Sequence, residues 1–181
     1  MSKILYHGSI YVFNDIDVNK GKPFKDFGKG FYATSVKQHA DRIALRNKRY
    51  TLRMLSRANK VSNITPYRYE MTFNENFDGL NVKEFKEANI EWVKFIIFNR
   101  LSRTGHKYDI VIGPTADERT TTIIESYIDV LKSNATDDVY NRIIKELKPE
   151  NLPKQYLFAT ERAVKQTLTH NANWRKTVKA R

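Results

Sequence analysis

Short strand-like runs, separated by longer helical segments, limit the fold of this chain more than any other sequence feature. Residues 3–6, 109–112 and 155–159 are short runs rich in β-branched and aromatic residues, and residues 69–73 alternate between apolar and polar side chains. Helical spacing is found over residues 36–58, 84–103, 121–132, 137–147 and 160–169. No strand is followed by a glycine-rich phosphate turn. The pattern predicts a mixed α+β domain rather than a parallel doubly wound sheet.

Length and composition favour one folded domain. The chain has 181 residues, without an internal repeat or a Pro/Gly-rich linker. We expect a domain over residues 1–170 and a loose basic tail over 171–181. Cysteine is absent, which excludes disulfides and cysteine-based zinc sites, and no ligand spacing indicates a metal. Without a long apolar run, we expect no membrane contact and a cytoplasmic location.

The charge balance favours anionic partners. Lys and Arg number 32 against 20 Asp and Glu, a formal charge of +12. One side of the expected helix over residues 36–58 is heavily basic, and Ser35 is its expected N-cap. An excess of this kind attracts nucleic acid, phosphate-bearing ligands or acidic proteins. A lysine-rich surface that serves only solubility is the alternative.

The segment His7-Gly8-Ser9 ends the first expected strand and is the first candidate site. A histidine followed by glycine presents a ring and an open backbone to a ligand, because glycine allows close approach. The alternative is a histidine that is satisfied within a turn.

Gly30-Phe31-Tyr32 forms a second candidate segment. Glycines beside aromatic residues suggest a backbone that bends around a flat group, and an aromatic ring there could stack on a cationic ring such as nicotinamide. A glycine-rich turn that leads into a core strand is the alternative.

Arg100 and Asp117 flank the buried strand at residues 109–112. Arginine binds phosphate in a bidentate manner, so Arg100 is a candidate phosphate ligand, although a structural ion pair with Asp109 is equally consistent. Asp117 follows the strand in a loop, which is a common place for functional carboxylates. It could instead cap the following helix.

Four ordered blocks together carry a resemblance to a known family. They are LYHGS, DFGKGFYAT, NR…YDIVIGPTAD and PKQYLFAT, which span residues 4 to about 165. The chain resembles an uncharacterised, DUF3990-like bacterial family that is grouped with the ADP-ribosyltransferase superfamily and often found in toxin-like gene settings. The resemblance implies a single-domain fold with a mixed sheet split by helices, and NAD as a substrate.

The superfamily's motifs imply roles for four residues. His7 would contact the adenosine ribose, the Gly8 backbone would hold the nicotinamide amide, and Tyr32 would pack against nicotinamide. Gln155 takes the position that is usually a glutamate bonded to the nicotinamide ribose. The first block also includes Ser9.

Gln155 departs from the superfamily pattern in a way that affects the chemistry. Glutamine can bond a ribose hydroxyl but carries no charge, so it cannot stabilise an oxocarbenium-like state as an anion. Either another carboxylate supplies that charge or the activity is weak or lost. Asp117 is the first candidate for this carboxylate, ahead of Glu118 and Glu161.

The resemblance implies a toxin-like transferase that moves ADP-ribose onto a nucleic-acid or protein target, with an antitoxin as a further partner. NAD hydrolysis at the same site is one alternative. Another is a non-catalytic nucleic-acid-binding module carried by residues 36–58 and by Trp174, Arg175 and Lys176. A third is a degenerate relative that binds NAD without chemistry.

Overall fold

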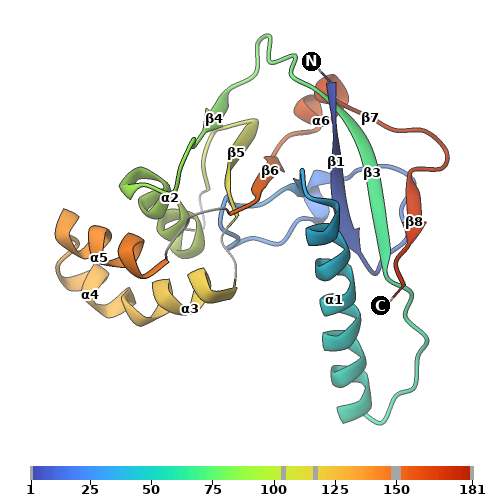
Figure 1. Ribbon diagram of the computed structural model, residues 1–181, viewed down its shortest axis with the longest axis horizontal. Coiled ribbons are helices and arrows are strands. Elements are labelled where there is room, and N and C mark those ends of the chain that lie inside the picture. The colour runs from blue at the N-terminus through green and yellow to red at the C-terminus, as the bar shows by residue number, and fades with distance from the viewer. Residues whose placement is uncertain (1, 103–104, 116–117, 148–151, 180–181) are drawn as a thin grey trace.

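A computed structural model describes residues 2–102, 105–115, 118–147 and 152–179 of this chain. One mixed, eight-stranded sheet forms its centre, in the order β4-β5-β6-β2-β1-β3-β7, with β8 beside β7 on the outer side of β3 (Figure 1). The strands are β1 Ser2–Ser9, β2 Phe31–Thr34, β3 Tyr67–Asn74, β4 Val82–Glu84, β5 Ile110–Pro114, β6 Lys154–Phe158, β7 Leu168–Thr169 and β8 Arg175–Thr177. Strands β4 and β5 are parallel and the other pairs are antiparallel.

The helices lie in two groups around the sheet. They are α1 Lys37–Arg57, α2 Ile90–Leu101, α3 Glu118–Ser126, α4 Ile128–Ser133, α5 Asp137–Leu147 and α6 Glu161–Thr167, with a 3-10 turn η1 at Val18–Lys20. Figure 1 shows α2 to α5 gathered in a helical lobe on one side, while α1 projects below the sheet on the other. The single-domain α+β architecture predicted from the sequence is confirmed. No helix in the described ranges is long and apolar enough to cross a membrane.

Several boundaries differ from the prediction for local physical reasons. Val36, not Ser35, is the N-cap of α1, and it makes no side-chain capping bond. The helix expected from residue 84 begins at Ile90, because the Asn89 side chain caps it by accepting from the Trp92 N–H at 3.0 Å. The helix expected over 121–132 is two helices, and its break lies at Tyr127.

The expected basic tail is part of the sheet where it is described. Residues Arg175–Thr177 pair with Tyr67–Tyr69 of β3. Trp174 is buried, its carbonyl accepts from the Glu70 N–H at 2.8 Å, and its ring meets that of Tyr69 edge-on. Burial of this indole holds the segment in place, so residues 174–178 are part of the fold and not a loose tail.

Two hydrophobic clusters cover the two faces of the sheet. Ile112, Tyr156 and Phe158 point into the cluster shared with β1 and β3. Val111 and Leu157 alternate with them and point into the cluster of the helical lobe. The sheet is therefore buried on both faces at β5 and β6, which fixes their register.

Candidate functional site

A cleft of about 660 Å³ lies where the middle of the sheet meets α1. Its walls come from the end of β1, from β2, from the first half of α1 and from the segment around Gln155, with Lys25 and Asp26 at one side. The structure thus brings together His7, Gly8, Tyr32 and Gln155 from distant parts of the chain. A cleft of this volume suits a small-molecule ligand.

Gly8 is required by the contact between β1 and α1. A Cβ atom at this position would lie 2.0 Å from the Ala40 carbonyl oxygen and 3.0 Å from the Ala44 nitrogen. Both alanines are fully buried. The glycine therefore lets a strand and a helix backbone touch, a packing role that the sequence analysis did not foresee.

His7 connects the two central strands through its side chain. Its Nδ1 lies 2.6 Å from the Tyr32 carbonyl oxygen, which can only accept, so Nδ1 carries a proton. The ring packs 4.6 Å from that of Phe31 and 5.9 Å from that of Phe13. Burial lowers the pKa of His7, against the smaller opposing effect of its backbone hydrogen bond. The imidazole is therefore neutral near pH 7, with Nε2 as its acceptor atom.

All residues of β1 and β2 are described, and the two strands share one register pair, Tyr6 with Thr34. Side chains alternate along β1, and His7 lies opposite Tyr69, so the His7 ring is on the sheet face away from Tyr6 and Gly8. His7 is one of the residues that line the cleft, at the junction of the two strands. This is a weakly joined point in an otherwise continuous sheet.

Tyr32 fixes the loop that precedes its own strand. Its hydroxyl donates to the Gly28 carbonyl oxygen at 2.7 Å and accepts from the Phe27 N–H at 3.1 Å. Burial, and then the nearby Asp26 charge, raise the pKa of Tyr32 well above its usual value. The phenol therefore remains protonated. With both hydroxyl contacts internal, the ring is the part of Tyr32 that can face a ligand.

The same loop is held from its other side by His106. Its Nε2 donates to the Phe27 carbonyl oxygen at 2.7 Å, while Nδ1 accepts from the Tyr108 N–H at 3.1 Å. Burial lowers the pKa of His106, again against the weaker effect of the backbone bond. The two bonds together require the neutral form, because a protonated Nδ1 could not accept from Tyr108.

Gln155 occupies a buried position on β6, between Gly113 of β5 and Thr34 of β2. Its Nε2 donates to the Pro114 carbonyl oxygen at 3.4 Å. The side chain lines the cleft and shares its sheet face with Tyr32 and Leu157. It is therefore not the exposed polar residue that the sequence allowed as an alternative.

Asp26 is a functional candidate that sequence reasoning missed. Arg100 contacts its Oδ1 through both Nε and Nη2, and Arg100 also donates to the Thr121 hydroxyl at 2.8 Å. Burial raises the pKa of Asp26, and the Arg100 charge only partly opposes this effect. It is the one acidic side chain among the described residues of the cleft wall. Asp26 lies in the DFGKG block that the sequence singled out, but no neighbouring residue indicated that its carboxylate would line a cleft.

Arg100 therefore does not pair with Asp109, and its guanidinium is occupied by Asp26 rather than open to a phosphate. Asp109 receives Arg162 at 2.9 Å, the Thr160 hydroxyl at 2.7 Å and the Asn81 N–H at 2.9 Å. Burial alone would raise the pKa of Asp109, but these bonds outweigh it and the pKa is lowered. Asp109 ties β5 to α6 and has a structural role.

The other predicted ligand residues lie behind the cleft wall. Ser9 accepts from the Tyr11 N–H at 3.0 Å, within a local turn. Phe31 is buried in the hydrophobic cluster, and its ring contacts that of His7 in a tilted arrangement. Gly30 has a φ of 155°, and a Cβ there would lie 2.4 Å from the Phe158 carbonyl oxygen. None of these three residues is among the described residues that form the wall of the cleft.

The carboxylates proposed to replace the missing glutamate have different outcomes. Asp117 and the side chain of Glu118 lie outside the described residues. Glu161 accepts from the Val18 N–H at 3.2 Å and is not among the described residues of the cleft wall. Over the ranges that the structure describes, no three His, Asp or Glu side chains gather as a metal site would need.

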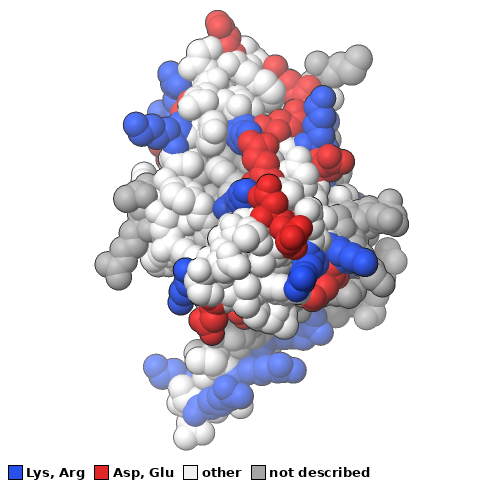
Figure 2. Space-filling model, turned by 90° about the vertical axis from the view of Figure 1, so that its left-hand side faces the viewer, with Lys and Arg blue, Asp and Glu red and all other residues white. Residues whose placement is uncertain are grey.

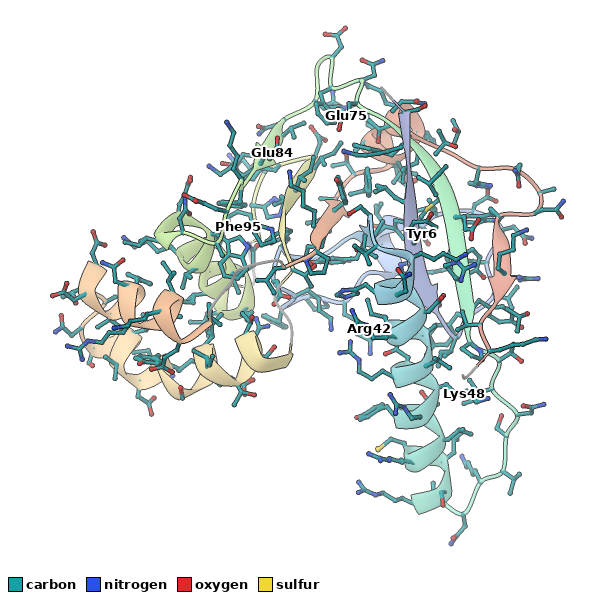
Figure 3. The ribbon with its side chains drawn as sticks, viewed as in Figure 1. Tyr6, Arg42, Lys48, Glu75, Glu84 and Phe95 are labelled. Atoms are coloured by element: carbon teal, nitrogen blue, oxygen red, sulfur yellow. The ribbon has the colours of Figure 1, made fainter. Side chains whose placement is uncertain are left out.

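The wall of the cleft along α1 is basic. Arg42, Arg46 and Arg49 line it from this helix, and Lys25 adds a fourth cation from the loop. Figure 3 shows Arg42 on the side of α1 that faces the helical lobe. Cations in this arrangement create a positive potential that favours phosphate groups.

The family match covers nearly all of this architecture. Residues 3–169 match the family model described as Protein of unknown function (DUF3990). The chain belongs to the DUF3990 family. No curated protein and no solved structure matches the chain. The DUF3990 match extends from β1 into β7 and includes every residue of the cleft wall, and it confirms the family part of the resemblance.

Proposed function

We propose that this DUF3990 protein is an NAD-dependent mono-ADP-ribosyltransferase, with its substrate site in the cleft between β1, β2, β6 and α1. One observation carries the proposal: His7, Tyr32 and Gln155 line a single cleft. The superfamily resemblance assigns the adenosine ribose, nicotinamide and nicotinamide ribose to these three residues. Their convergence was not required by their positions in the sequence.

The electrostatics of the cleft support a dinucleotide ligand. NAD carries a diphosphate, and the arginines of α1 supply cations along one wall. The neutral His7 offers Nε2 as an acceptor for a ribose hydroxyl, because Nδ1 is bound to Tyr32. The ring of Tyr32 provides a flat surface for nicotinamide.

The proposed reaction exchanges one bond at the nicotinamide ribose. The bond between ribose C1′ and the nicotinamide ring nitrogen breaks, and its electron pair goes to that nitrogen, which gives neutral nicotinamide. An acceptor nucleophile forms the new bond to C1′ and loses its proton to water. Positive charge builds up on the ribose during this exchange, and groups that stabilise this charge accelerate the step.

Asp26 is the residue that we propose for the anionic role that Gln155 cannot fill. Arg100 holds its Oδ1, and no described residue donates to Oδ2. In this proposal Oδ2 faces the developing charge while Gln155 orients the ribose through its amide. Asp117 is the competing candidate.

Nicotinamide release from NAD, followed by mass spectrometry, tests the proposal. Purified protein is incubated with NAD and cell lysate, and the wild type is compared with His7→Ala, Tyr32→Ala and Gln155→Ala. Asp129→Asn, an exposed position on α4, is the matched control. We expect the first three variants to lose release and the control to retain it. Absence of both release and NAD binding in the folded wild type contradicts the proposal.

NAD hydrolysis by water at the same site is the second candidate function. The cleft is accessible to solvent, which is compatible with hydrolysis, since water needs no docking surface. Release that is equally fast with and without lysate, and leaves no ADP-ribose on macromolecules, would favour hydrolysis.

A further inference from the structure

Helix α1 carries a row of exposed arginines that we name the arginine stripe. Its members are Arg42, Arg46, Arg49, Arg53 and Arg57. Successive members are three or four residues apart, so they share one face of the helix. At a rise of about 1.5 Å per residue, the stripe is roughly 22 Å long.

The stripe begins in the cleft and continues beyond it. Arg42, Arg46 and Arg49 line the cleft, whereas Arg53 and Arg57 lie on the part of α1 that projects from the body. In Figure 3, Lys48 is on the opposite side of α1 from Arg42. The stripe is therefore a continuous track of positive charge that leads to the proposed reaction site.

All residues of α1 are described, and burial against the rest of the protein does not account for the projecting half of this helix. The buried residues of α1 are Ala40 and Ala44, so no residue after Ala44 is buried. Like charges three or four residues apart weaken a helix slightly. The one acidic residue of α1, Asp41, is bound to Arg68 on another face. A bound polyanion would relieve this repulsion.

The charge distribution over the surface is equally one-sided. In Figure 2 the projecting lower part of the molecule shows Lys and Arg without Asp or Glu, while acidic side chains gather higher up. Arg42, Arg49, Arg53 and Arg57 make no ion pair with any described residue. Guanidinium groups that are not engaged by a carboxylate can bind phosphate groups.

We infer that single-stranded nucleic acid binds along the arginine stripe and presents a base or sugar to the cleft as the ADP-ribose acceptor. Phosphates would contact the stripe, and Tyr50, 66% exposed beside Arg46 and Arg53, would stack on a base. A single strand is required because a base inside a duplex is not accessible to a reaction centre in a cleft. The role of the nucleic acid as ADP-ribose acceptor rests on the proposed transferase activity, whereas its binding to the arginine stripe does not.

Binding is tested by fluorescence anisotropy with labelled oligonucleotides of about 12 nucleotides, over a series of salt concentrations. Single-stranded RNA, single-stranded DNA of the same sequence and the corresponding duplex are compared. The test variant is Arg53→Gln with Arg57→Gln. The control removes two exposed cations of the helical lobe, Lys132→Gln with Lys145→Gln, and so changes the net charge equally.

We expect wild type and control to bind single strands more tightly than duplex. The arginine variant should bind about tenfold more weakly, and the slope of log K against log salt should fall by about 1.4, for two lost contacts. Tyr50→Ala should weaken binding without changing this slope. A preference for RNA or for DNA assigns the sugar of the natural acceptor.

Three results would overturn the inference. They are an arginine variant that binds like the wild type, a control that loses as much affinity as the arginine variant, and displacement of the oligonucleotide by polyglutamate as readily as by an unlabelled strand. Nicotinamide release and mass gain by the oligonucleotide are measured on the same protein. Stripe-dependent binding without any release from NAD would reject the transferase and retain the docking surface.

Discussion

The Nδ1–H of His7 donates to the backbone carbonyl of Tyr32 at 2.6 Å, so one candidate residue positions the other. This bond crosses the opening between β1 and β2, where the strands share a single register pair. The two residues therefore act as a unit. Loss of His7 would change the position of the Tyr32 ring as well as remove Nε2.

Replacement of Tyr32 separates the role of its ring from that of its hydroxyl. Tyr32→Phe keeps the ring but removes the contacts with Gly28 and Phe27, which we expect to cost about 1–3 kcal/mol of unfolding free energy. Nicotinamide release should persist in Tyr32→Phe and be lost in Tyr32→Ala. Denaturant unfolding and the release assay are the measurements. Equal loss of release in both variants would contradict a role for the ring.

Gly8→Ala should destabilise the protein rather than change its ligand contacts alone. The new Cβ would overlap the Ala40 carbonyl oxygen, so β1 and α1 must move apart, at a cost of about 3 kcal/mol. Gly79→Ala is the comparison, because no atom lies within 4 Å of a Cβ there, although its φ of 66° adds some strain. Chemical denaturation measures both. A Gly8→Ala protein as stable as the wild type would refute the packing explanation.

Asp26→Asn should reduce the rate of nicotinamide release about 10²- to 10³-fold, with a smaller effect on the KM for NAD. The reason is that the variant keeps the shape of the side chain but removes the negative charge that we propose to face the ribose. Asp117→Asn is measured in parallel. If Asp117→Asn loses the activity and Asp26→Asn does not, the anionic role belongs to Asp117.

Stability should fall as the pH decreases from about 7 through 6.5. Burial lowers the folded-state pKa of both His7 and His106, whereas the unfolded chain takes up protons near the ordinary histidine pKa of about 6.5. The unfolded state thus binds more protons in this window, and stability is fully present only above it. Urea midpoints from pH 8 to 5.5 provide the test, and His106→Gln should flatten the profile. A wild-type midpoint that does not change would exclude this linkage.

Trp174→Ala should cost about 3–5 kcal/mol of unfolding free energy. The indole is buried against Tyr69 and Phe13 and stacks on His170 at 3.8 Å. Its loss would release β8 from β3. Thermal unfolding of this variant, beside the exposed Lys176→Ala, measures the effect. A small change for Trp174→Ala would show that the C-terminal segment contributes little to the fold.

Elements with strong local patterns were predictable from the sequence. Helix α5 follows its predicted bounds, 137–147, because its apolar residues repeat at helical spacing. The alternation of residues 69–73 placed β3 in the same way. Strands β4, β7 and β8 have two or three residues each and were missed, since their pairing partners, not their own sequence, make them strands.

The candidate site was predictable only in part, for the same reason. The His7-Gly8 and Tyr32 segments were identifiable because glycine beside aromatic residues is a local signal. The contact between Asp26 and Arg100 joins a loop to a distant helix, and nothing in either segment indicates the other. The NAD, target and antitoxin predictions stay predictions.

The pairing of β2 with β6 has a consequence for how the protein folds. Phe31 lies opposite Phe158, so these central strands come from opposite ends of the sequence. Contacts between distant parts of a chain form slowly, because the intervening loop must close first. Partly synthesised chains would have α1 and the antiparallel pair of β1 and β3 but no cleft. During translation, the proposed chemistry would therefore be one of the last properties that the protein acquires.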